Sequence, residues 1–249
     1  MKRPTQYLAA VVGLVLLLGP VVSWAGRPLD TEDTGTVDPG KVELEVSGDY
    51  AKNPEDTTGS FKGVLNVGLV KGLEARIESS FLFLDPDEGS RENGIGDSLF
   101  GVKYRILEET DRRPALLGSF TLRLPTGDED RGLGAADVDV GLLAVASKSI
   151  GPLTLTWNGG YTFVTRDRDL DTWVLNGAVE YRVTPAWSLV GETVNTVAAN
   201  KGGVDTYVLR AGSVYAVHER VKLDGAVGVG LTRESPDVIV TVGFTIGLN

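Results

Sequence analysis

The chain has 249 residues, of which 34 are acidic and 24 are basic, so its formal net charge is −10 at pH 7. So acidic a protein repels the phosphates of DNA and RNA, which excludes nucleic acid as a partner. Without cysteine and with a single histidine, the chain also excludes disulfides and metal sites built from Cys and His ligands.

Residues 1–25 have the features of an export signal. Lys2 and Arg3 supply the positive charge, residues 8–18 are uninterruptedly apolar, and Ser23 and Ala25 are the small residues that a signal peptidase reads. An uncleaved anchor is the alternative, but a spanning helix needs about 20 apolar residues. We predict a signal peptide that is cleaved after Ala25.

The mature chain is expected to form one domain after a short leader. Residues 26–39 are polar and show no strand pattern, so they either plug the protein or lie free in the periplasm. Residues 40–249 contain no linker and no low-complexity tract, and we predict that they form the whole of an outer-membrane β-barrel.

Alternation of apolar and polar residues is the main signal in this domain. In Val42–Val46 the apolar residues Val42, Leu44 and Val46 fall on one face of a strand and Glu43 and Glu45 on the other. The pattern returns about a dozen times, at the spacing of strands. The predicted strands are 41–51, 60–70, 73–84, 94–107, 115–124, 136–148, 153–164, 172–183, 187–195, 205–217, 220–231 and 237–248.

The connections between these segments alternate in length. Long polar connections at 53–60, 85–93, 125–135, 165–171, 196–203 and 232–236 alternate with shorter ones such as 71–72 and 184–186. Long loops at one end and tight turns at the other are typical of outer-membrane barrels. The sequence therefore predicts an all-β, transmembrane, antiparallel up-and-down barrel of about twelve strands with both termini in the periplasm.

The two faces of the strands differ in chemistry. Nearly all aromatic residues lie on the apolar face, whereas the opposite face carries charges of both signs, which would be unfavourable against lipid. A soluble sandwich would have to hold those aromatics in its core, and a lipocalin-like barrel has only eight strands. The residues predicted to line the lumen are Glu43, Glu45, Glu74, Arg76, Glu78, Asp97, Lys103, Arg105, Arg123, Asp137, Asp139, Glu180, Arg182, Glu192, Arg210, Lys222 and Asp224.

Four leucines fall on these polar faces: Leu82, Leu84, Leu99 and Leu143. A β-bulge or drift at a strand end would return them to the apolar side, and we favour this explanation. An inward apolar patch, suited to a hydrophobic solute, is the alternative.

No pattern indicates catalysis. His218 lies in a tight turn, a poor place for a Ser-His pair, and the spacing of Asp137 and Asp139 fits lumen lining better than a glycosidase pair. The acidic loop clusters, such as Asp85, Asp87 and Glu88, lack the spacing of a calcium loop. We expect no enzyme activity, no cofactor and no bound metal.

Four blocks resemble a bacterial family: RPLDTEDTGTVDPGKVELE, GIGDSLFGVKYRILEE, RPALLGSFTLRLPTGDEDRGLG and GPLTLTWNGGYTF, which begin at Arg27, Gly94, Arg113 and Gly151. The chain is similar here to the transporter-like outer-membrane family labelled "MetA-pathway of phenol degradation". The resemblance implies an outer-membrane barrel with a role in the passage of small compounds, aromatic ones among them. It supplies no catalytic motif.

Together these features favour a porin-like or hydrophobic-compound barrel in the cell outer membrane, with cation preference if it conducts. The alternative is a closed structural or adhesive barrel whose acidic loops face the outside. The expected partners are outer-membrane lipid, lipopolysaccharide, the barrel assembly machinery and an unidentified small solute.

Overall fold

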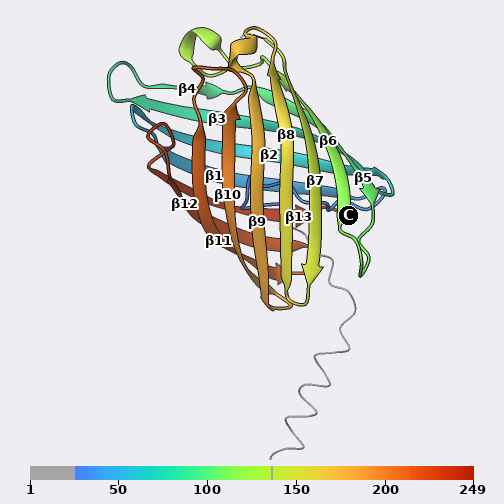
Figure 1. The fold of residues 1–249 in the computed structure, drawn as a ribbon. Helices are drawn as coiled ribbons and strands as arrows, with labels where there is room; N and C mark the ends of the chain where they lie inside the picture. Colours follow the sequence, from blue (N-terminus) through green and yellow to red (C-terminus); the bar gives the residue numbers. More distant parts are fainter. Residues whose placement is uncertain (1–25, 136) are drawn as a thin grey trace, which may run out of the picture.

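The protein is one β-sheet that closes on itself (Figure 1). The computed structural model describes residues 26–135 and 137–249; the predicted signal peptide lies outside the described residues. The strands are β1 (Val42–Lys52), β2 (Asp56–Val70), β3 (Leu73–Pro86), β4 (Glu92–Ile95), β5 (Ser98–Leu107), β6 (Ala115–Leu124), β7 (Asp139–Ile150), β8 (Leu153–Val164), β9 (Thr172–Thr184), β10 (Trp187–Ala198), β11 (Thr206–His218), β12 (Val221–Gly230) and β13 (Val238–Gly247).

Antiparallel pairing of neighbours in the sequence closes the ring. β1 pairs with both β2 and β13, and β2 pairs with β3, so no main strand is left as an edge. β4 and β5 share one position: β4 pairs with residues 81–84 of β3 and β5 with residues 73–78. The barrel therefore has twelve strand positions, which confirms the predicted twelve-stranded up-and-down fold.

Most strands lie where the alternation predicts them, and β6 and β8 have the predicted bounds. Two regions differ. The predicted loop 53–60 is a tight connection, because Thr57 and Thr58 pair with Lys52 and Ala51 and extend the hairpin. The predicted strand 94–107 is broken at Gly96 and Asp97.

The connections give the barrel two unlike ends. Residues 87–91, 125–138, 165–171, 199–205 and 231–237 are at what we call the long-loop end, and residues 71–72, 151–152, 185–186 and 219–220 are at the short-turn end (Figure 1). Two 3₁₀ turns, η1 (Glu129–Arg131) and η2 (Arg168–Leu170), belong to the long loops. Among the described residues, no helix is long and apolar enough to cross a membrane.

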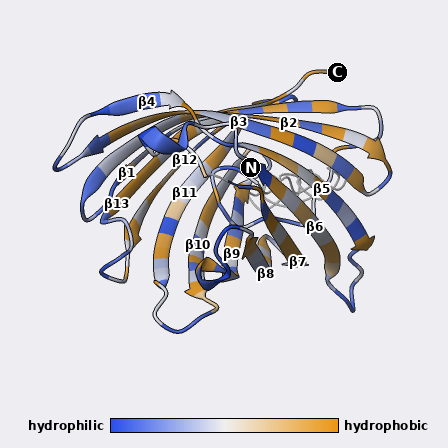
Figure 2. Cartoon of the chain, turned by 90° about the horizontal axis from the view of Figure 1, so that it is seen from above, coloured by the Kyte–Doolittle hydropathy of each residue, from blue (hydrophilic) through white to orange (hydrophobic). Residues whose placement is uncertain are grey.

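The barrel is apolar outside and polar inside. Along the strands, hydrophilic and hydrophobic residues alternate (Figure 2). Phe61, Tyr104 and Trp157 point outward and are 62%, 54% and 51% exposed, whereas the polar side chains of Ser47, Asn66 and Glu192 are buried. An exposed apolar surface that surrounds the whole molecule would aggregate in water, so it is suited to lipid.

A charged residue introduced on the outer surface tests whether this surface faces lipid. Val179 lies in the middle of β9, faces outward and is 38% exposed. We expect Val179→Arg to lower the free energy of unfolding in lipid vesicles by about 2–4 kcal/mol, since a cation near the bilayer midplane loses its hydration. The measurement is urea unfolding followed by tryptophan fluorescence.

Val204→Arg is the matched control, because Val204 is 56% exposed in the loop 199–205 and stays in water. Equal stability of the two variants would contradict a lipid-facing outer surface.

Candidate functional site: the lumen and its leader

The leader, residues 26–39, lies inside the barrel and not free beside it. The start of the described chain lies within the ring when the barrel is seen end-on (Figure 2). Residues of the leader contact side chains from β3, β5, β8, β10, β11 and β12. Of the two alternatives left open by the sequence, the structure has the leader in the lumen.

Glu32 is the central contact of the leader. Its Oε2 lies 2.6 Å from Nη1 of Arg76, and its Oε1 lies 2.7 Å from Nζ of Lys103. Its backbone is held as well, because Glu32 N–H donates to Asn158 Oδ1 at 2.8 Å and Asn158 Nδ2 donates to Glu32 O at 2.7 Å. Burial alone would raise the pKa of Glu32, but Lys103 and Arg76 lower it to about 2. Glu32 is therefore an ionised anchor.

Glu192 and Arg210 hold the first part of the leader. The carboxylate of Glu192 accepts hydrogen bonds from the backbone N–H groups of Asp30 and Thr31, at 3.0 and 2.8 Å, and from the Thr31 hydroxyl at 2.6 Å. Arg210 forms an ion pair with Asp30 at 2.6 Å and donates to Pro28 O at 2.9 Å. These contacts are charge-assisted, and Glu192 and Arg210 are buried, whereas the side chain of Asp30 is 60% exposed.

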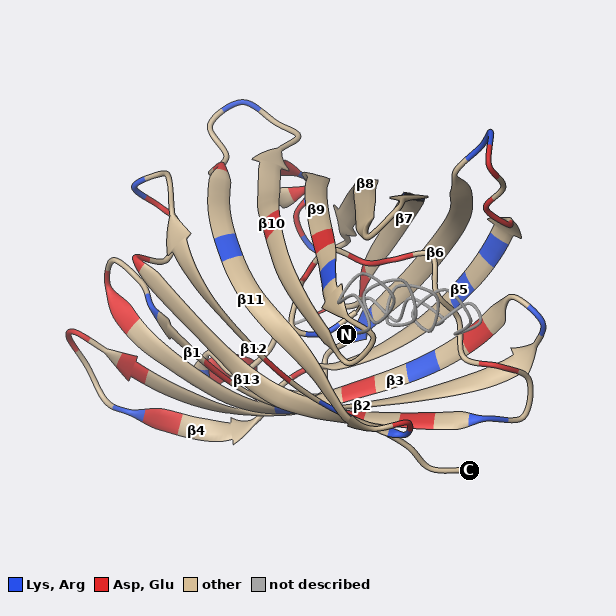
Figure 3. Ribbon diagram, turned by 90° about the horizontal axis from the view of Figure 1, so that it is seen from below, with Lys and Arg blue, Asp and Glu red and all other residues tan. Residues whose placement is uncertain are grey.

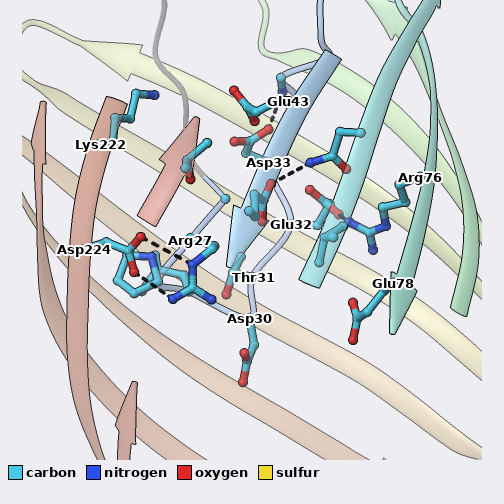
Figure 4. A pocket seen from close by; sticks show the side chains of 18 of the residues that line it. Arg27, Asp30, Thr31, Glu32, Asp33, Glu43, Arg76, Glu78, Lys222 and Asp224 are labelled. Atoms are coloured by element: carbon cyan, nitrogen blue, oxygen red, sulfur yellow. Dashed lines mark hydrogen bonds and ion pairs between the residues drawn. The ribbon is translucent and has the colours of Figure 1, made fainter. Parts of the chain in front are cut away.

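Three more side chains hold the two ends of the leader. Glu74 accepts a hydrogen bond from Val37 N–H at 2.8 Å, and Arg105 donates to Thr34 O at 2.8 Å. Near the start of the leader, Arg27 and Asp224 form an ion pair at 2.9 Å (Figure 4).

A cavity of about 290 Å³ remains beside the leader. It is lined by leader residues and by inward side chains that come largely from β1, β2, β3 and β12 (Figure 4). Two smaller cavities of about 30 and 140 Å³ lie nearby. Asp33 borders the largest, and burial raises its pKa to about 7, despite the opposing effect of Lys103.

The structure brings many of the predicted lumen residues together. Acidic and basic positions alternate along β3 inside the ring (Figure 3). The predicted residues that line the main cavity are Glu43, Glu45, Glu74, Arg76, Glu78, Lys103, Arg210, Lys222 and Asp224. Arg105 and Glu192 bind the leader, Glu180 lines the cavity of 30 Å³, and Arg182 shares the inward register of Glu180 on β9.

Four predicted residues lie apart, near the long-loop end. Arg123 forms ion pairs with Asp139 and Asp97. Asp97 lies in the break between β4 and β5 and accepts hydrogen bonds from Gly127 N–H and Ala135 N–H, so it holds the loop 125–138. The expected position of Asp137 in a strand is wrong: it is exposed in that loop, because β7 begins at Asp139.

The explanation favoured for the four leucines is also wrong. The register of β2 and β3 shifts only between Gly68 and Val70, far from Leu82 and Leu84. Leu99 opposes Arg123, and Leu143 opposes Ser119, an inward residue, so both keep the inward register. All four leucines therefore face the lumen without a bulge.

Sequence reasoning did not identify the leader residues that contact the wall. Thr31, Glu32 and Asp33 have no periodic pattern, and their partners are far away in the sequence. The one available signal was charge: the inward face of the strands has several arginines, and the leader has acids that can pair with them.

The described part of the chain contains no group of three or more His, Asp or Glu side chains arranged to hold a metal ion. His218, at the end of β11, accepts a hydrogen bond at Nδ1 from Arg220 N–H at 3.3 Å within its turn.

Removal of the charge of Glu32 tests the anchoring of the leader. In a Thr34→Cys background, we expect Glu32→Gln to raise the rate of thiol modification at residue 34 about tenfold or more, because a buried ion pair loses one partner. Thr34 is 8% exposed and the chain has no cysteine of its own, so this thiol reports on the leader alone.

Glu88→Gln, at an exposed loop position, is the control that removes an acid without touching the leader. A modification rate that is the same in both variants would contradict the anchoring role of Glu32.

Comparison with solved structures places this fold among outer-membrane barrels. The "COG4313 outer membrane channel from Pseudomonas putida F1" has a TM-score of 0.71 and 16% identity, covering 88% of this chain and 100% of that one. The NanC porin has a TM-score of 0.62 and 13% identity, covering 82% and 100%. The "CymD monoaromatic hydrocarbon channel" has a TM-score of 0.52 and 9% identity, covering 85% and 89%.

No curated protein matches the chain in sequence. A family model does match, and it covers residues 25–248, nearly the whole chain. The protein therefore belongs to the family described as "Putative MetA-pathway of phenol degradation".

Proposed function

We propose that the protein is an outer-membrane channel for small solutes, in which the leader narrows the lumen. The observation that carries this proposal is the cavity of about 290 Å³ between the leader and a polar wall inside a closed barrel. Eight strands leave an interior filled by side chains and sixteen leave an open channel. A twelve-stranded barrel with an internal leader fits an intermediate, narrow passage.

The size of the cavity limits what could pass. At about 30 Å³ for each water, 290 Å³ holds roughly ten waters, the room of one small organic molecule. The lining includes ten acidic and six basic residues, which favours cations over anions.

The proposal also implies how the protein lies in the membrane. The apolar outer surface would lie in the outer membrane, with the long-loop end toward lipopolysaccharide and the leader entering from the periplasm. Insertion would then depend on the barrel assembly machinery.

Deletion of residues 27–38 tests the role of the leader. The variant should still form a barrel, since every strand pair lies outside the leader. We expect its single-channel conductance in a planar bilayer to rise roughly threefold or more, because the lumen of a twelve-stranded ring is wide once it is unobstructed. A heat-shift gel confirms folding before the recording.

Unchanged conductance after the deletion would contradict a constricting leader. If neither protein conducts, the closed structural or adhesive barrel becomes the better explanation, and the acidic long loops become the place to look for a partner.

A second candidate function, passage of apolar solutes, is favoured by one observation. Leu82 and Leu84 point into the lumen at the long-loop end, and buried Leu133 lies beside Gly94 in the gap near the break between β4 and β5. This apolar group could receive a hydrophobic compound. The solved CymD channel carries a monoaromatic hydrocarbon description, and its barrel is similar in fold to this one.

Uptake of an apolar dye tests this candidate. In intact Gram-negative cells that produce the protein, we expect Leu82→Ser to slow the entry of 1-N-phenylnaphthylamine about tenfold, because a hydroxyl replaces apolar surface. Leu142→Ser, which removes a leucine that faces outward and is 47% exposed, should leave the rate unchanged. Equal rates of dye entry in both variants and the parent protein would contradict the passage of apolar solutes through the lumen.

A further inference from the structure

The larger cavity of the lumen lies on one side of the leader. This cavity of about 290 Å³ borders β1, β2 and β3 and the inward residues of β12 and β13. A cavity of about 30 Å³ lies toward β8, β9 and β10, where Asn158 and Glu192 bind the leader. Glu74 and Arg76 bind the leader on the side of the larger cavity.

This space continues toward the short-turn end. A cavity of about 140 Å³ there is bordered by Lys41, Arg220 and Asn249. It shares Val37, Glu43, Lys222 and two further residues with the main cavity. The two cavities are therefore neighbours at the start of β1, and together they mark an off-centre path beside the leader.

Three basic side chains along this path have acidic partners. Arg27 pairs with Asp224 at 2.9 Å, Lys62 with Glu78 at 3.5 Å, and Arg76 with Glu32 at 2.6 Å. These pairs reduce the positive charge that a passing solute meets.

The acids of β1 have neutral hydrogen-bond donors instead. Glu45 accepts from Asn66 Nδ2 at 2.8 Å, and Asp49 accepts from the hydroxyls of Ser47 and Thr241 at 2.9 and 2.8 Å. Neutral donors do not cancel a carboxylate charge, so Glu45 and Asp49 contribute negative charge to the β1 side of the path.

Two buried oxygen atoms on this path lack a donor among the described residues. They are Oδ2 of Asp33 and Oδ1 of Asn66, whose residues are only 6% and 3% exposed. Both residues line the main cavity, Asn66 from β2 and Asp33 from the leader, and Figure 4 shows Asp33. A buried acceptor without a donor is unfavourable, so an N–H group of a solute that reached these two atoms would be stabilised.

We propose that Asp33, Glu45, Asp49 and Asn66 form a transit site for small solutes that carry a primary ammonium group. An ammonium group supplies three N–H donors and one positive charge. Val37, Val64 and Val214 also line the cavity and suit a short hydrocarbon chain. A bare metal ion fits less well, because the described residues contain no converging set of metal ligands. This site rests on the proposed channel function and specifies its substrate class.

The test uses the refolded mature protein in a planar bilayer with n-butylammonium as the probe. We expect cation-selective current in KCl and half-block of that current at a defined butylammonium concentration. Glu45→Gln with Asp49→Asn, and separately Asp33→Asn, should raise that concentration about tenfold. Asp33→Asn is a close match to the native residue in shape, since Asn keeps an acceptor for Gly35 N–H, but it removes the charge that also pairs with Lys103 at 3.9 Å.

Two controls separate the site from general effects. Glu45→Asp keeps the charge and should keep the block, and Glu88→Gln removes an exposed loop acid and should change nothing. Current that is blocked equally in all variants would overturn the transit site and leave the channel function intact.

If folded protein passes no current, the channel function fails, and calorimetric titration with butylammonium then decides the site separately. Binding that is lost in Asp33→Asn supports the site, and the absence of binding to the parent protein overturns it.

Discussion

Closure of the hydrogen-bond ladder is the constraint on which the rest of this structure depends. Lipid offers no partner for a backbone N–H or C=O group, so a sheet can remain in a membrane only if it has no open edge. β1 meets this requirement by pairing with β2 on one side and with β13, from the far end of the chain, on the other.

Closure also decides the chemistry of the interior. Because side chains alternate along each strand, a ring with an apolar outside must turn every second residue inward. In this chain those residues include Lys103, Arg210 and Glu192, all buried. Buried charges are tolerated only with partners, and the leader supplies several of them: Glu32 for Lys103 and Asp30 for Arg210. The leader is thus both an obstruction and a set of counter-charges.

Strand positions and the identity of the inward residues could be predicted because both depend on local alternation. The inward direction of Glu43 and Glu74 follows from alternation within their own strands. The same alternation places Leu82 inward, so the β-bulge that we expected there was wrong. The prediction of a long loop after β1 was wrong for a local reason, because threonine is common in loops but also has a high propensity for strands.

The path of the leader and the break at Gly96 and Asp97 could not be predicted, because both depend on distant partners. Thr31 N–H donates a hydrogen bond to Glu192, which is 161 positions away in the sequence. Asp97 accepts hydrogen bonds from the backbone N–H groups of Gly127 and Ala135. Neither contact leaves a periodic signal. The charge balance was visible in the sequence, but which acid meets which arginine is set by the ring.

The attachment of the leader links the fold to its use. Asn158, Glu192 and Arg210 hold it on one side, and Glu74, Arg76 and Lys103 hold it on the other. The cavity of about 290 Å³ lies beside it, along β1. The ion pairs that hold the leader also neutralise Arg76, Lys103 and Arg210, while Glu45 and Asp49 accept hydrogen bonds from neutral donors. Attachment therefore produces both the position of the passage and its negative character, and a change that loosens the leader should alter size and selectivity together.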